Sequence, residues 1–315
     1  MAVVPLTDIQ FAAERIADSV IHSPLLRLPV DDAPWQIYLK LENLQPIGSF
    51  KLRGAGNAIQ LADAKALTGG VWTASAGNMA QGVAWHARRL GIPCHVVVPD
   101  HAPQTKLNAI ERLGGKIIPV PFASWWDTLV SGEFAGLDGL FIHPVSDPAV
   151  IAGNGTIGLE ILRDLPDVAA VVIPYGGGGL CAGIASAIRA IKPAARIYAA
   201  EVATAAPLAA SLRAGEPTEI AYTPSFVDGI GSSTVLPEMW ELARSLLDGS
   251  LVASLDEVRA AIRILARRAR VIAEGAGAAG VAAALAGGAG GGKVVCVVSG
   301  GNIDLATLAE ILQTG

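Results

Sequence analysis

The spacing of apolar residues along the chain predicts strands and helices in regular alternation. The segment 35–42 has apolar residues at every second position, which predicts a strand with one buried face: Ile37, Leu39 and Leu41. Ser49 then stands where an N-cap is expected, and a helix is predicted from about Phe50. Short runs rich in Val and Ile alternate with helical segments from there to the C-terminus.

The other predicted elements keep the same alternation. Strands are predicted at 71–75, 95–98, 116–120, 140–143, 169–173, 196–201 and 293–298. Helices are predicted at 79–90, 103–113, 156–165, 180–191 and 256–272, followed by a Gly/Ala-rich helix and a C-terminal helix. Such alternation predicts an α/β fold of parallel sheets covered by helices. Ligands of these folds bind beyond the carboxyl ends of the strands, so we expect the chemistry in the turns that follow them.

Composition indicates a compact globular protein. Hydrophobic residues make up 52% of the 315 positions and charged residues 16%. The net charge of −5, the pI near 5.6 and the scattered Lys and Arg residues argue against a nucleic-acid partner. The five His residues are not spaced as metal ligands, so no metal is expected.

The cysteines and the N-terminal segment favour a cytoplasmic protein. Cys94, Cys181 and Cys296 are an odd number and lie in apolar stretches, which indicates buried, reduced thiols. Segment 1–20 lacks a basic start and contains Asp8 and Glu14, so we interpret it as an amphipathic helix and not as a signal peptide. The uncharged run 275–292 is mostly Gly and Ala, which suits close helix packing better than a membrane span.

The turn after strand 169–173 has the features of a phosphate site. Its glycines, followed by a helix, would present several backbone N–H groups and the positive end of the helix to an anion: Gly176, Gly177, Gly178 and Gly179. One alternative is a tight turn that only packs the helix on the sheet. Another is a dinucleotide fold, since the run satisfies G-x-G-x-x-A and Glu201 ends the next strand.

Three further turns carry candidate chemistry. Lys51 lies in the first turn of a helix, where the dipole would favour a neutral amine able to form an imine; a solvated lysine is the alternative. The turn 75–78 could hold a carboxylate at a helix start, or Asn78 could merely cap that helix. Ser299 follows strand 293–298 and precedes two glycines. This turn either presents the serine hydroxyl to a ligand or is an ordinary turn.

Taken together, these segments resemble the threonine dehydratase and serine racemase branch of the fold-type II pyridoxal-phosphate enzymes, which share the tryptophan synthase β-like fold. The similarity covers almost the whole chain in the same order, through KLENLQPIGSFKLRGAGNAI, TASAGNMAQGVA, HPVSDPAVIAGNGTIGLEIL, PYGGGGLCAGIA and VSGGNID. The resemblance implies two parallel-sheet domains with the active site in the cleft between them. It also implies a large domain of residues 1–67 and 145–315 and a small inserted domain of residues 68–144.

The resemblance assigns roles residue by residue. Lys51, after Phe50, would be the catalytic lysine that binds pyridoxal 5'-phosphate as a Schiff base. The phosphate would lie on residues 176–180, which end at Leu180, and Ser299 would hydrogen-bond the pyridine nitrogen. The substrate carboxylate would be bound by the segment Ser75, Ala76, Gly77, Asn78 and Met79, with Asn78 also beside the phenolic oxygen of the cofactor.

Departures from the family pattern refine this expectation. Ala76 replaces the serine whose hydroxyl delivers a proton in serine racemases, which favours elimination over racemisation. Met79 replaces a histidine, and Pro207 replaces an aspartate that binds metal in some members, although Glu201 matches another ligand. Trp125 and Trp126 fall in a region that often shapes the substrate side-chain pocket.

The resulting hypothesis is a homodimeric ammonia-lyase that acts on a small amino acid. It would convert a β-hydroxy amino acid such as L-threonine or L-serine to a 2-keto acid and ammonia by α,β-elimination. Three alternatives stay open within the family: a dehydratase for 3-hydroxyaspartate, one for phenylserine, and an amino-acid racemase. An NAD-dependent oxidoreductase or a non-catalytic binding protein would represent a different class.

Overall fold

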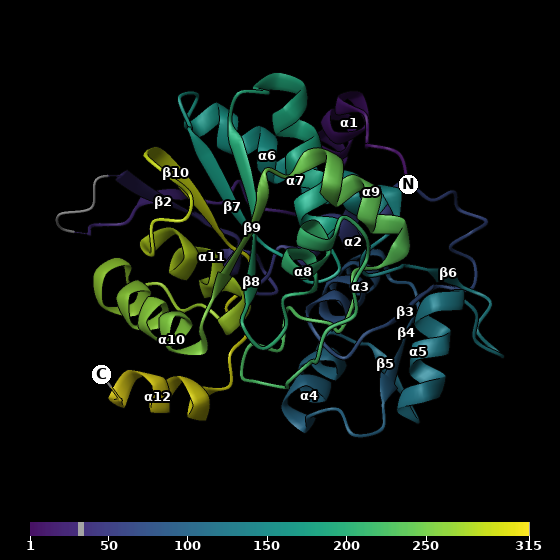
Figure 1. Cartoon of the computed structure of the whole chain (residues 1–315). Coiled ribbons are helices and arrows are strands. Elements are labelled where there is room, and N and C mark those ends of the chain that lie inside the picture. Colours follow the sequence, from purple (N-terminus) through teal and green to yellow (C-terminus); the bar gives the residue numbers. More distant parts are fainter. Residues whose placement is uncertain (31–34, 315) are drawn as a thin grey trace.

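The computed structural model describes residues 1–30 and 35–314, whose strands form two separate sheets (Figure 1). The larger sheet has the strand order β1-β2-β10-β7-β8-β9. Its strands are β1 (Leu25–Arg27), β2 (Trp35–Leu41), β7 (Ala170–Pro174), β8 (Arg196–Val202), β9 (Gly249–Ala253) and β10 (Gly292–Val298). The pairs from β2 to β9 are parallel, as predicted, whereas the short edge strand β1 pairs with β2 in antiparallel orientation.

Helices cover both faces of the larger sheet because its strands alternate their side chains between two apolar cores. Val171 and Ile173 of β7 face one core, which contains residues of α1 (Leu6–Ile16), α6 (Pro148–Asp164), α7 (Gly179–Ile191), α8 (Pro207–Ala214) and α9 (Pro237–Leu246). Val172 faces the other core, with α10 (Leu255–Ile264), α11 (Gly275–Leu285) and α12 (Leu305–Gln313). Figure 1 shows α10, α11 and α12 together on one side of this sheet.

The smaller sheet is parallel throughout and has the order β5-β4-β3-β6. It consists of β3 (Val71–Ala74), β4 (Cys94–Pro99), β5 (Lys116–Val120) and β6 (Leu140–Phe141). Helices α3 (Asn78–Leu90), α4 (Gln104–Arg112) and α5 (Phe122–Ser131) connect its strands and pack on it. In Figure 1 this sheet lies beside the larger one, with α4 and α5 at its periphery.

Helix α2 (Lys51–Leu61) joins the two halves, since it packs against α6 and also against α3. The contact with α6 is close because glycines stand at it: a Cβ atom on Gly153 would lie 2.5 Å from the carbonyl oxygen of Arg53. A Cβ atom on Gly54 would lie 2.7 Å from Val150. These glycines therefore set how deeply α2, and with it Lys51, lies in the molecule.

Some elements differ from those predicted. Helix α6 starts at Pro148, well before the predicted 156, because the Asp147 side chain accepts hydrogen bonds from the N–H groups of Ala149 and Val150. The predicted helix 256–272 is α10 followed by a π-helical turn, Leu265–Ala269, which ends with Arg270 in the left-handed region at φ 60°. None of the helices in residues 1–30 and 35–314 is long and apolar enough to cross a membrane.

Candidate active site

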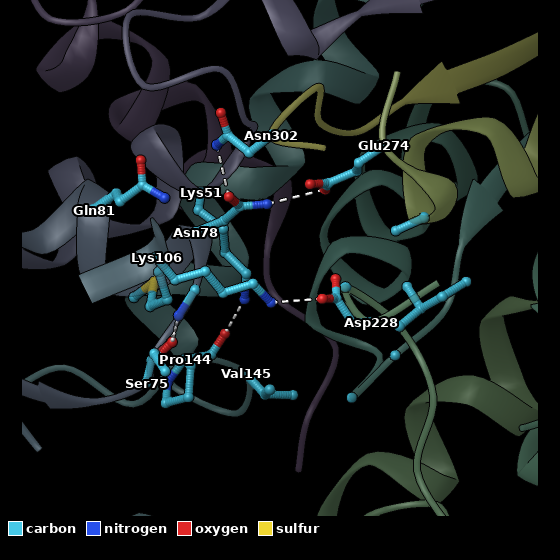
Figure 2. A pocket seen from close by; sticks show the side chains of 18 of the residues that line it. Lys51, Ser75, Asn78, Gln81, Lys106, Pro144, Val145, Asp228, Glu274 and Asn302 are labelled. Atoms are coloured by element: carbon cyan, nitrogen blue, oxygen red, sulfur yellow. Dashed lines mark hydrogen bonds and ion pairs between the residues drawn. The ribbon is translucent and has the colours of Figure 1, made fainter. Parts of the chain in front are cut away.

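A cavity of about 410 Å³ lies where the two sheets meet, and the four turns singled out in the sequence line it (Figure 2). Strand β3 and helices α3, α4 and α5 supply one wall through the turns at their ends. Strands β7 and β10 and helix α2 supply the opposite wall in the same way. The carboxyl ends of parallel strands from both sheets thus converge on one space, as expected for a ligand site.

Lys51 is the first residue of α2, and its amine is in this cavity. The helix begins one residue later than predicted, with Phe50 at the N-cap position and the Ser49 hydroxyl accepting from the Lys51 N–H at 3.3 Å. Lys51 Nζ donates to the carbonyl oxygen of Pro144 at 2.5 Å (Figure 2). Burial lowers the pKa of this amine to about 8, so the neutral, nucleophilic form is accessible near neutral pH.

The glycine turn lies between β7 and α7 and also lines the cavity. Gly178 takes the left-handed conformation, with φ 98°, at the N-cap of α7. A Cβ atom on Gly177 would lie 2.5 Å from the Val145 side chain, and one on Gly179 would collide with the Val145 carbonyl oxygen. Tight packing therefore accounts for two of the glycines. The turn still presents the start of a 13-residue helix to the cavity, where backbone N–H groups can bind a phosphate.

Asn78 is the first residue of α3, and its side chain crosses to the other wall of the cavity. Its Nδ2 donates to Glu274 Oε1 at 3.0 Å, and its Oδ1 accepts from Asn302 Nδ2 at 2.7 Å (Figure 2). Gly77 occupies the N-cap position, so the capping alternative for Asn78 is wrong. A Cβ atom on Gly77 would meet nothing within 4 Å, which leaves open space above this helix start for a bound anion.

Ser299 follows β10 and packs against the turn that carries the lysine. It is 3% exposed, and its carbonyl oxygen accepts from the Phe50 N–H at 3.0 Å. Ser49 and Gly300 form a β-bridge beside this contact. The two turns, almost 250 residues apart in sequence, are therefore one unit, which holds Ser299 and Lys51 in the same cavity.

Three charged residues in the cavity wall did not stand out in the sequence: Lys106, Asp228 and Glu274. Lys106 Nζ and Asp228 Oδ2 form an ion pair at 2.7 Å that links α4 to the loop after α8 (Figure 2). Glu274 precedes α11, and burial first, then the charge of Asp228, raises its pKa to about 7. In the sequence, Glu274 is marked only by its position as an acidic residue between an apolar segment and a Gly/Ala-rich helix.

The remaining predicted positions separate into two groups. Ala76, Met79 and Trp125 line the cavity, and Trp125 packs beside Phe122 with 5.5 Å between ring centroids. Trp126 instead has 41% of its surface exposed to solvent. We find no feature at Trp126 that would shape a substrate pocket.

Glu201 serves the fold and lies outside the cavity lining. Its carboxylate accepts from the N–H groups of Leu208 and Ala209 at 2.9 and 2.7 Å and from the Ser250 hydroxyl at 2.5 Å. It thereby satisfies the first N–H groups of α8, the helix that Pro207 begins. Glu201 is fully buried and outside the cavity, so it is not placed to bind the ribose of a dinucleotide. Across the described part of the chain, no cluster of three His, Cys, Asp or Glu suits a metal.

These features define a class of enzyme that uses an aldehyde cofactor with a phosphate group. A desolvated lysine amine, a glycine-lined helix start and a buried serine at a strand end surround one cavity between two sheets. The residues fit pyridoxal phosphate: the Lys51 amine can bind its aldehyde and the N–H groups at the start of α7 can hold its phosphate, whereas side chains at Gly177 or Gly179 would collide with Val145 and displace that turn.

The comparisons place the chain in a family. The pyridoxal-phosphate dependent enzyme family matches residues 16–300, and the chain belongs to that family. It is 40% identical to L-threonine ammonia-lyase of Thermotoga maritima, over 99% of this chain and 79% of that protein. It is 39% identical to the catabolic L-threonine dehydratase TdcB of Escherichia coli, over 98% of this chain and 96% of that one.

Solved structures agree with this family. Maize serine racemase superimposes with a TM-score of 0.90 at 33% identity, covering 99% of this chain and 98% of that one. The processed threonine deaminase isoform 2 of Solanum lycopersicum gives a TM-score of 0.87 at 33% identity, covering 98% and 88%. The predicted fold-type II architecture is thereby confirmed.

Proposed function

We propose that the chain is a pyridoxal-phosphate-dependent ammonia-lyase that converts L-threonine or L-serine to a 2-keto acid and ammonia by α,β-elimination. The observation that carries this proposal is the Lys51 amine, desolvated at a helix start in a cavity that also contains the glycine turn. The threonine ammonia-lyase and dehydratase relatives, which align over almost the whole chain, support the same reaction.

When bound, pyridoxal phosphate supplies an electron sink for the bond electrons released at Cα of the substrate. The residues of the chain would do the rest. Lys51, with its pKa near 8, accepts the Cα proton at Nζ as a general base. The N–H groups of residues 176–180 hold the phosphate, those of 75–78 hold the substrate carboxylate, and Ser299 offers a neutral hydroxyl to the pyridine nitrogen.

The test is a keto-acid assay over a panel of hydroxy amino acids with the purified enzyme. We expect threonine and serine each to give one equivalent of ammonia for every equivalent of 2-keto acid. Lys51→Ala should lower turnover by at least about a thousandfold, because it removes a general base and nucleophile. The panel includes 3-hydroxyaspartate and phenylserine, the alternatives left open by the sequence. Keto acid formed from neither threonine nor serine, or full activity of Lys51→Ala, would contradict the proposal.

We also propose the domain limits expected from the sequence, 1–67 with 145–315 and 68–144. The separate sheet of β3 to β6, all within residues 71–141, supports the inserted small domain. A cytoplasmic homodimer remains our proposal for the working form. The three buried free thiols are compatible with a reducing compartment.

A further inference from the structure

Glu274 is a carboxyl group inside the cavity to which the reaction as outlined gives no role. It is 8% exposed and stands immediately before α11. Its side chain makes no capping hydrogen bond to that helix. It extends into the cavity instead, where Oε1 accepts from Asn78 Nδ2 at 3.0 Å and the Asn302 backbone N–H provides a second bond (Figure 2).

The surrounding backbone is shaped to admit this carboxyl group. A Cβ atom on Gly300 would collide with Glu274 Oε1, and one on Gly229 would approach it to 3.4 Å. The Glu274 N–H donates to the Gly300 carbonyl oxygen at 3.0 Å, which fixes the backbone on the same side. The carboxyl group therefore has a defined position between two glycine-containing loops.

Asn78 is held at both ends of its amide. Its Oδ1 accepts from Asn302, which itself donates from the same Nδ2 to the Ile47 carbonyl oxygen at 2.8 Å. Its Nδ2 donates one hydrogen to Glu274, which leaves the second hydrogen for a group in the cavity. Glu274 and Asn302 together therefore determine which way the Asn78 amide points.

Several charged groups face Glu274 from the elements around it. Asp228, in the loop before α9, raises its pKa after burial itself, and Lys106 on α4 lowers it, as do the bonds from Asn78 and Asn302. Lys51 on α2 lies in the wall of the same cavity. The balance leaves a carboxyl group that changes its protonation state near pH 7, within the working range of an enzyme.

We propose that Glu274 is a positioning residue whose ionised form fixes the Asn78 amide toward the cofactor, so that its protonation loosens the site. The inference rests on the proposed function in placing Asn78 beside the cofactor. As a carboxylate, Glu274 accepts from both amides. Protonation removes the negative charge and places an O–H on one carboxyl oxygen, so the bonds from Asn78 Nδ2 and the Asn302 N–H become weaker.

The first experiment compares the pH dependence of kcat for the holoenzyme and for Glu274→Gln, which is uncharged at every pH. We expect equal rates at pH 6 and about a tenfold lower kcat for the variant at pH 8, the size of one lost bond to a charged acceptor. Glu111→Gln, an exposed carboxyl on α4, is the control and should follow the parent at both pH values. A parent-to-variant ratio that does not change with pH would overturn the proposal.

A second measurement does not depend on turnover. The folded-state pKa of Glu274 is raised from its ordinary value of 4.5 to about 7, chiefly by burial. Its protonated form therefore contributes stability that is fully present below the unfolded pKa and is lost as pH rises through 7. The melting temperature of the cofactor-free parent should therefore fall between pH 6 and pH 8 relative to that of Glu274→Gln. Asp228→Asn should move this fall to lower pH.

These two readouts separate the failure of this inference from that of the proposed function. If the parent forms no keto acid, the proposed function is wrong, yet the melting temperatures still report the titration of Glu274. A visible absorbance of the bound cofactor that titrates near pH 7 in the parent but not in Glu274→Gln would support the link through Asn78. The same titration in both proteins would overturn it.

Discussion

At Ala76 a methyl group lines the cavity in the turn that begins α3. Racemisation of an amino acid needs an acid that can protonate Cα on the face opposite Lys51, and a methyl group has no proton to give. We therefore expect Ala76→Ser to raise D-serine formation relative to pyruvate formation when L-serine is supplied. Both products are measured in one incubation, with the parent protein as control. Substantial D-serine from the parent would assign it a racemase activity instead.

The candidate residues found in the sequence are those that follow a strand or begin a helix. Lys51, Asn78, Ser299 and the glycine turn could be located because each lies in a short segment with its own turn signal, and the cavity brings them together. Glu274 was missed because its partner Asn78 lies 196 residues away and the burial that shifts its pKa exists only in the fold. The roles of these residues in catalysis stay predictions.

Helix α2 is anchored by a network of buried charges two residues after Lys51. Arg53 is 1% exposed and bonds Glu42 on one side at 2.8 Å and Glu160 on the other at 2.7 Å. Lys40 of β2 reaches Glu160 at 2.5 Å. These pairs tie the helix to β2 and to α6, so they maintain the position from which Lys51 enters the cavity.

Removing Arg53 should therefore be costly. Arg53→Met leaves the fully buried Glu42 without its cation, and we expect a loss of about 3–5 kcal/mol in the free energy of unfolding. Arg244→Met is the matched control: its pair with Glu241 is more than half exposed, and its loss should cost no more than about 1 kcal/mol. Urea unfolding of both variants gives the comparison, and equal losses would show that the network does not anchor the helix.

Element boundaries depended on contacts that sequence patterns do not contain. Segment 148–158 contains Gly153, Gly155 and Gly158, residues that argue against a helix in water. It is helical because those glycines allow α6 to approach α2 and α7 closely. In segment 256–272 the predicted helix is longer than the observed one. Its residues have good helix propensity and predict one long helix, but the chain turns at Arg270 and leads Glu274 into the cavity.

For the whole molecule, the alternation of strands and helices was sufficient to predict parallel sheets and a site between them. The alternation does not predict the order of the strands in the sheet. Strand β10 lies between β2 and β7, although more than 100 residues of chain separate it from each of these neighbours. The polar contacts across the cavity, Lys106 with Asp228 and Asn78 with Glu274 and Asn302, also depend on how the halves meet.

The rates at which the three cysteines are chemically modified can report how often each half of the molecule opens. Cys94 lies in β4 of the smaller sheet, while Cys181 and Cys296 lie in α7 and β10 of the larger half, and all are buried and free. Burial raises the pKa of Cys94 to about 12 and raises those of the other two thiols, so reactive thiolate is scarce in the folded state. Labelling by a disulfide reagent must then wait for a local opening.

The smaller sheet, with its smaller apolar cores, should open first. In dilute urea we expect Cys94 to be modified faster than Cys296, as followed by mass spectrometry of peptides from the labelled protein, with the fully unfolded chain as the reference for intrinsic reactivity. Equal rates at both thiols would mean that the two halves open as one cooperative unit. With ordered rates, the modification rate of each thiol reports how often its own half of the molecule opens.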